Sequence, residues 1–123
     1  MGLVENLAAA CKDFPQARVV AFADLSSSTV LASQGRANVT QEHLNMLCSQ
    51  ARTSFDDPLF SLSVEAFGEP NAAVIMDQVS VRVFLRSEID PADAICCICD
   101  HGIDLAEFVV RVRGILEQLD AGT

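Results

Sequence analysis

Residues 94–105 read AICCICDHGIDL. The run before Asp100 is continuously apolar and of strand length, which is typical of a strand at the centre of a sheet covered on both faces. Asp100-His101-Gly102 ends this strand, and Asp104 can cap a helix that follows. The apolar residues of that helix recur at helical spacing and are Leu105, Phe108, Val109, Val112, Leu116 and Leu119. The stretch therefore predicts a central strand followed by an amphipathic helix.

Two further strands are expected upstream of this stretch. Ala72 to Met76 and Ser80 to Ser87 are rich in strand-forming residues, and Asp77-Gln78 separates them as a turn. Successive side chains of a strand point to opposite faces. One face of the second strand carries Val81, Val83 and Leu85, and the other carries Arg82, Phe84 and Arg86. We expect this strand to be half exposed.

The N-terminal part of the chain predicts a helix and a hairpin. Apolar residues recur at helical spacing before Pro15; they are Leu3, Val4, Leu7, Ala8 and Cys11. The helix should end before Pro15, because a proline disfavours the helical conformation of the residue that precedes it. Arg18 to Asp24 and Thr29 to Ser33 are strand-like, and the serine cluster at 26–28 separates them. These two strands should pair with each other.

A second helix is expected after Gly35. Asn38 or Thr40 can accept hydrogen bonds from its first N–H groups, and the helix should run to about Ser54. Its apolar stripe is thin and consists of Leu44, Leu47, Cys48 and Ala51. A helix of this kind covers a sheet with one side and faces water or a partner with the other.

Residues 58–68 admit two interpretations. Phe60, Leu62 and Val64 alternate with polar residues, as in a strand, whereas Asp57-Pro58 is a typical helix start. Outside this segment the order is helix, two strands, helix, three strands, helix. Helices on both faces of one antiparallel sheet bury such stripes best. We therefore expect residues 1–123 to form a single α+β domain, a three-layer α/β/α sandwich.

Composition limits the classes of partner. The chain carries 8 basic and 17 acidic residues, a net charge of -9, which repels nucleic acid and anionic membrane surfaces. Its apolar runs are shorter than the roughly 20 residues of a membrane span, and its start lacks the basic region of a secretory signal. The five cysteines are odd in number, as is usual for free thiols in a reducing compartment. These features indicate a cytoplasmic protein.

The cysteine run is the main candidate for chemistry. Cys96 and Cys99 form a C-x-x-C with Cys97 and His101 nearby, which is compatible with a metal or redox site. On a strand, however, Cys96 and Cys99 point to opposite faces, and no second cysteine pair is present. His43 is expected in the first turn of a helix and His101 in the turn after a strand. A solvated histidine is ordinary in both positions. We expect no catalytic, cofactor-binding or metal-binding residues and hence no enzyme.

A surface for a protein partner is more plausible than a catalytic site. Arg82, Phe84 and Arg86 would place two arginines beside an exposed aromatic ring, a combination typical of protein interfaces. The alternative is that the first or last helix covers Phe84 and that the arginines pair with nearby acids. The sequence favours neither.

The order of elements, the stretch from Val30 to Gly35 and the stretch from Asp93 to Leu105 resemble the Roadblock/dynein light-chain family of the profilin-like superfold. This resemblance implies five strands in the order 2-1-5-4-3. It also implies a homodimer formed by the third strands and the middle helix, and small Ras-like GTPases or motor subunits as partners. The interface residues would be Leu44, Leu47, Ala51, Ala72, Val74 and Met76. The serines after Asp24 and the segment 58–68 depart from the family pattern.

Three hypotheses follow for the function. The first is a non-enzymatic homodimeric adaptor that binds a protein, with a small GTPase as the leading class. The second is a small-molecule sensor module with a cavity over the sheet. The third is a thiol-based redox protein that uses the cysteine run.

Overall fold

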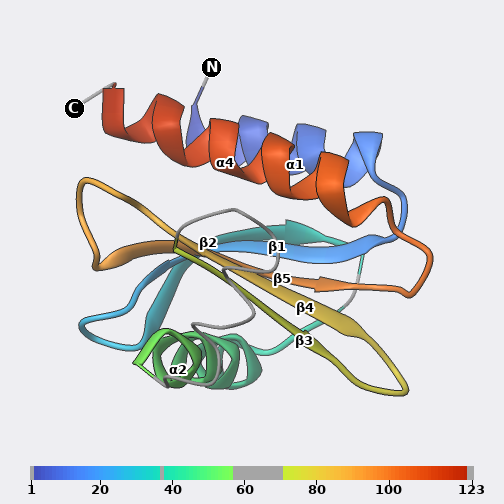
Figure 1. Cartoon of the computed structure of the whole chain (residues 1–123), viewed down its shortest axis with the longest axis horizontal. Helices are drawn as coiled ribbons and strands as arrows, with labels where there is room; N and C mark the ends of the chain where they lie inside the picture. The colour runs from blue at the N-terminus through green and yellow to red at the C-terminus, as the bar shows by residue number, and fades with distance from the viewer. Residues whose placement is uncertain (1, 37, 57–70, 122–123) are drawn as a thin grey trace.

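The computed structural model describes residues 2–36, 38–56 and 71–121. The helices of these ranges are α1 (Leu3–Asp13), α2 (Gln41–Asp56) and α4 (Leu105–Ala121), and the strands are β1 (Ala17–Asp24), β2 (Thr29–Gly35), β3 (Ala72–Met76), β4 (Val81–Arg86) and β5 (Asp93–Cys99). Figure 1 shows α1 and α4 on one side of the sheet and α2 on the other. The expected three-layer sandwich is confirmed.

The strands form one antiparallel sheet in the order β2-β1-β5-β4-β3. This is the order that the family resemblance implies. The central strand is β5, where Cys97 lies between Val20 of β1 and Val83 of β4. The continuous apolar run therefore occupies the position expected for a strand that is covered on both faces. The edges of the sheet are β2 and β3.

One core lies between the sheet and the layer of α1 and α4. Its members include Leu7, Val20, Ile95 and Phe108, all of which are fully buried. Phe14, at the end of α1, meets the Phe108 ring edge-on with 5.2 Å between the ring centroids. This geometry suits the quadrupoles of two aromatic rings and joins the first helix to the last.

The second core lies between the sheet and α2. Leu44, Leu47, Cys48 and Ala51 of α2 pack there against β-strand residues that include Phe84 and Cys96. Many of the strand residues are small, namely Ala21, Ala23, Ala73 and Ala94. Small side chains let the helix approach the sheet closely.

The helix starts follow the predicted caps. The Thr40 hydroxyl accepts a hydrogen bond from the backbone N–H of His43 at 3.1 Å, and Asp104 accepts one from the N–H of Glu107 at 3.2 Å. These side chains satisfy N–H groups that the first turn of a helix leaves without partners. At the end of β2, a Cβ on Gly35 would overlap the carbonyl oxygen of Arg18, so the close approach of β2 to β1 requires glycine there.

Some expectations need correction. The apolar stripe expected for the first helix included Val4, but Val4 is 47% exposed. The side of α1 that packs on the sheet is centred on Leu7 and Ala10, which are both fully buried. Strand β4 is not half exposed, since α2 covers Phe84 completely. The interpretation of residues 58–68 lies outside the described residues. In the ranges that are described, no helix has the length and apolar content needed to cross a membrane.

Candidate protein-interaction site

The β3 edge is the first part of the candidate site. Its residues Ala72–Met76 carry no charge and include no proline, which are the usual means of protecting an edge strand. Within the described ranges, β3 pairs with β4 alone, and no side chain hydrogen-bonds its backbone. Val74 is half-buried against the α1/α4 core, and Met76 is 62% exposed. The described residues therefore leave the outer backbone groups of β3 unoccupied by side chains.

The β2 edge is uncharged as well, but side chains occupy its backbone groups. The N–H of Val30 donates to Asn45 Oδ1 at 3.0 Å, and Gln41 Nε2 donates to the Val30 carbonyl at 2.9 Å. The Cys11 thiol donates to the Gln34 carbonyl at 3.5 Å. An incoming strand would have to displace these bonds. The two edges of the sheet are therefore not equivalent.

The residues that the resemblance assigns to the dimer interface fall into two groups, one buried in the chain and one at its surface. Leu44, Leu47, Ala51 and Ala72 are at most 5% exposed, and they lie in the cores of the chain itself. Val74 is half-buried and Met76 is 62% exposed, so these two residues of the set reach the surface. The outward side of α2 is polar except for Met46, which is 59% exposed.

Arg82, Phe84 and Arg86 do not form the exposed patch that the sequence suggested. Phe84 is fully buried, and the helix that covers it is α2 instead of the first or last helix. Arg86 donates to Asn71 Oδ1 at 2.8 and 3.2 Å, and its guanidinium lies 4.7 Å from the centroid of the Phe55 ring. The alternative is correct in that the ring is covered and Arg82 pairs with an acid, Asp77, but the partner of Arg86 is an amide and the covering helix is α2.

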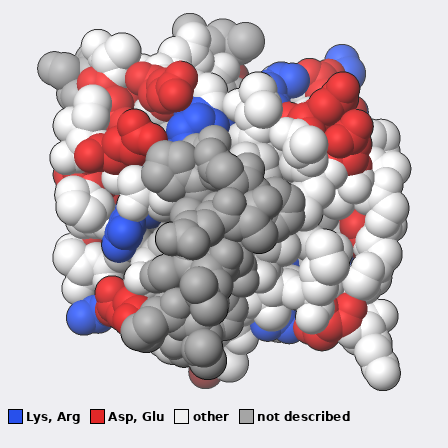
Figure 2. Space-filling view, in the orientation of Figure 1, with Lys and Arg blue, Asp and Glu red and all other residues white. Residues whose placement is uncertain are grey.

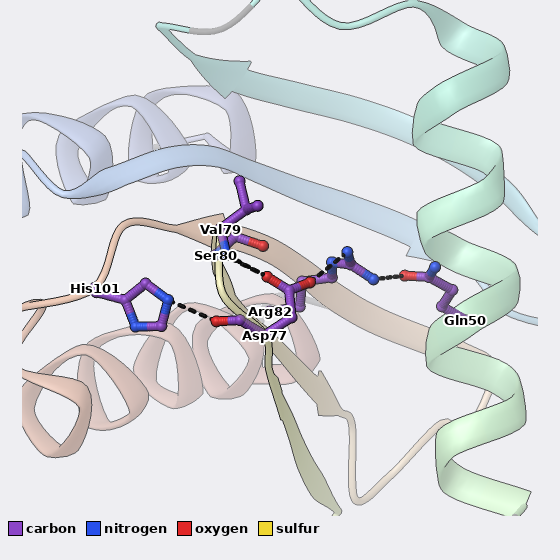
Figure 3. A network of polar contacts seen from close by, with 6 residues as sticks. All are labelled: Gln50, Asp77, Val79, Ser80, Arg82 and His101. Atoms are coloured by element: carbon purple, nitrogen blue, oxygen red, sulfur yellow. Dashed lines mark hydrogen bonds and ion pairs between the residues drawn. The ribbon is translucent and has the colours of Figure 1, made fainter.

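Arg82 belongs to a polar network around the turn between β3 and β4 (Figure 3). Its guanidinium donates to Asp77 Oδ2 at 2.9 Å and to Gln50 Oε1 of α2 at 2.9 Å. Asp77 Oδ1 accepts the backbone N–H groups of Ser80 at 2.7 Å and Val79 at 2.8 Å. These two bonds favour the ionised carboxylate and lower the pKa of Asp77.

His101 completes this network from the loop before α4. Its Nε2 lies 2.7 Å from the carbonyl oxygen of Asp77, and since a carbonyl only accepts, Nε2 is the donor. The network thus connects the turn beside β3 to α2 and to the end of β5. The Asp77 turn is visible in the sequence as an aspartate three residues before a serine. The contact between Arg82 and Gln50 joins segments that are distant in the chain, so nothing in the sequence pattern indicated it.

The cysteine run has the geometry expected for core residues. Cys97 and Cys99 face the α1/α4 core and Cys96 faces α2, so the C-x-x-C pair diverges. Burial raises the pKa of all three thiols, that of Cys99 to about 12. Across the described ranges, no His, Cys, Asp and Glu side chains gather in threes as a metal site requires. Neutral buried thiols are poor nucleophiles.

The sequence matches no protein-family model and no curated protein. The structure, in contrast, is similar to a Roadblock/LC7 domain from Streptomyces avermitilis, with a TM-score of 0.71 and 11% identity, over 98% of this chain and 97% of that one. Myxococcus xanthus MglB gives a TM-score of 0.67 and 15% identity, over 95% and 90% of the two chains. An MglB described as having a tetrameric arrangement gives 0.69 and 16%, over 95% and 84%. The chain has the Roadblock fold.

Proposed function

We propose that this chain is a non-enzymatic, cytoplasmic adaptor that forms a homodimer through its β3 edges and binds a protein partner. The leading partner class is a small Ras-like GTPase, as the resemblance to the Roadblock family implies. The observation that carries the proposal is the difference between the two sheet edges. Side chains of α1 and α2 occupy backbone groups of β2, whereas β3 is uncharged and no side chain of the described residues hydrogen-bonds its backbone.

The proposed dimer follows from symmetry. Two β3 strands that pair antiparallel are related by a two-fold axis perpendicular to the sheet. Such an axis joins the two sheets into one and keeps both α2 helices on the same face. Val74 and Met76 would contribute side chains to the junction, while Leu44, Leu47, Ala51 and Ala72 hold α2 and β3 in place from the core.

The Asp77 network supports this arrangement. The turn that follows β3 directly is fixed to α2 through Arg82 and Gln50 (Figure 3). An edge strand that must present its backbone to a second copy benefits from such a fixed end, because less conformational entropy is lost on pairing. The tetrameric arrangement of one MglB shows that a protein of this fold assembles with further copies.

The burial of the thiols favours an adaptor over a redox protein. Cys96, Cys97 and Cys99 are fully buried, and their raised pKa values keep them protonated near neutral pH. Oxidation or transfer chemistry requires an accessible thiolate. The cores are also filled on both faces of the sheet by side chains of the chain itself.

The partner class is tested with small Ras-like GTPases from the organism that encodes this chain. Titration calorimetry would use the GTPase loaded with GDP or with a non-hydrolysable GTP analogue. The proposal expects binding that depends on the nucleotide, because these proteins change the surface of their switch segments with the γ-phosphate. Absence of binding in both nucleotide states would refute the GTPase as partner and leave the dimer to be tested separately.

A further inference from the structure

A groove of about 350 Å³ lies between α2 and the sheet, next to the start of β4. Its floor is apolar and is formed by Val19, Val39, Leu47 and Ile98. Its volume falls within the range of roughly 300 to 1,000 Å³ that is typical of ligand sites. We call this cavity the α2 groove.

Two exposed apolar side chains border the α2 groove. Met46 of α2 is 59% exposed, and Val79, in the turn after β3, is 73% exposed. Methionine adapts its shape to different apolar partners because it is unbranched and has three rotatable bonds. The groove can therefore accept an apolar side chain between these two residues.

Two arginines line the α2 groove, and each is paired with an aspartate that lies outside the lining. Arg18, Arg82 and His43 line it, and no aspartate or glutamate does so in the part of the chain that the structure describes. The chain has 17 acidic and only 8 basic residues. Acidic side chains also cover more of the face shown in Figure 2 than basic ones do. A carboxylate that takes the place of Asp100 beside Arg18, or uses the remaining N–H donors of Arg82, is better matched to this groove than to the acidic remainder of the surface.

The two arginines of the α2 groove differ in how firmly they are held. Arg82 is held in place by its bonds to Asp77 and Gln50, and those bonds use two of the five N–H donors of a guanidinium (Figure 3). Arg18 is 3.7 Å from Asp100 in an ion pair that is exposed on both sides. A pair of this kind contributes little stability, so Arg18 can turn to a new carboxylate at small cost.

We propose that the α2 groove binds a segment of a partner protein in which a carboxylate side chain stands beside an apolar one. The apolar side chain contacts Met46, Val79 and the floor, and the carboxylate accepts hydrogen bonds from the guanidinium groups, whose planar fork matches its two oxygens. A polyphosphate chain is a poorer occupant, because it has no apolar side chain to contact Met46, Val79 and the floor. The inference rests on the proposed role in protein binding and specifies the chemistry of the partner.

The test uses the full chain and an immobilised array of heptapeptides. Each peptide has a central leucine, phenylalanine or methionine flanked by aspartate or glutamate, and a matched set has lysine in place of the acids. We expect the acidic set to bind and the lysine set not to bind. Arg18→Gln combined with Arg82→Gln should weaken binding of the acidic peptides about tenfold or more. Met46→Ser should weaken it as well.

The matched control is Arg111→Gln. Arg111 pairs with Asp13 at 2.7 Å in the α1/α4 layer, so its loss removes one positive charge without touching the groove. Urea denaturation of each variant verifies that it is folded, and Met46→Ser keeps the test valid if the arginine double variant is unstable. Equal binding of both peptide sets, equal loss in Arg111→Gln, or binding of neither set would overturn the inference. The mass of each variant in sedimentation reports on the dimer independently.

Discussion

Replacing Phe84 with alanine should destabilise the chain severely. Phe84 is fully buried, and its direct neighbours on the adjacent strands are Ala73 and Cys96. These small side chains cannot fill the space that the ring would leave. Truncation of a buried phenylalanine costs about 3 to 5 kcal/mol, and poor collapse of the site favours the upper part of this range. The whole domain is stabilised by only about 5 to 15 kcal/mol.

The assay is urea denaturation followed by circular dichroism. With a slope of about 2 kcal/mol per molar urea, the expected loss lowers the midpoint by about 2 M. The control is Val79→Ala, at a position that is 73% exposed, where we expect a change of no more than about 0.5 kcal/mol.

The two variants distinguish a core residue from a surface contact. If Phe84→Ala and Val79→Ala had the same small effect on the midpoint, Phe84 could not be covered by α2. The ring would then be available to a partner, as the exposed-patch interpretation of the sequence had it. In that case the packing of α2 on the sheet would be wrong.

Other variants test the remaining layers. Phe108→Ala should cost about 3 to 5 kcal/mol because its fully buried ring holds α4 on the sheet, whereas Glu117→Ala, on the exposed side of α4, should change the free energy of unfolding by no more than about 0.5 kcal/mol. Gly35→Ala should lower the urea midpoint markedly, since its Cβ would overlap the backbone of Arg18; an unchanged midpoint would contradict the close approach of β2 to β1. Stability should also fall as the pH rises above 9.0, the ordinary pKa of cysteine, because Cys99 stays protonated up to about 12 in the folded chain while the unfolded chain loses this proton. Urea midpoints at pH 7 and pH 10 check this, and Cys99→Ala should reduce the difference.

The sequence predicted most of the architecture because periodicity reports directly on burial. The continuous run from Ala94 to Cys99 is typical of a strand covered on both faces, and the stripe that contains Phe108 is typical of a helix that faces a core; both are found in those positions. The caps at Thr40 and Asp104 are local features, in which a side chain bonds a backbone group three residues later. Local chemistry of this kind can be read without the tertiary structure.

The candidate site was harder to predict, because it depends on contacts between distant segments. The alternation in β4 correctly separated the two faces, but it could not tell that α2 covers Phe84. The arginines on that face made it look like a surface, although they extend past the ring to Gln50, Asp77 and Asn71.

The difference between the sheet edges was equally hidden in the sequence. Both edge strands are uncharged. Strand β3 is entirely apolar and β2 contains polar residues, but this difference does not reveal which edge has its backbone groups occupied. Asn45 and Gln41 occupy the edge of β2 only because α2 places them there, at 3.0 and 2.9 Å from the backbone of Val30. A thin apolar stripe on α2 gave no indication of this role.

The homodimer through β3 is tested most directly by sedimentation equilibrium of three proteins at micromolar concentration. The unchanged chain should have about twice its monomer mass of 13.2 kDa. Leu31→Lys, at a position on the β2 edge that is 61% exposed, should leave this mass unchanged. Val74→Lys should give the monomer mass while circular dichroism shows a folded chain, because two lysines would meet near the two-fold axis with poor access to water. A monomer mass for the unchanged chain, or dissociation by Leu31→Lys and not by Val74→Lys, would contradict assembly through β3.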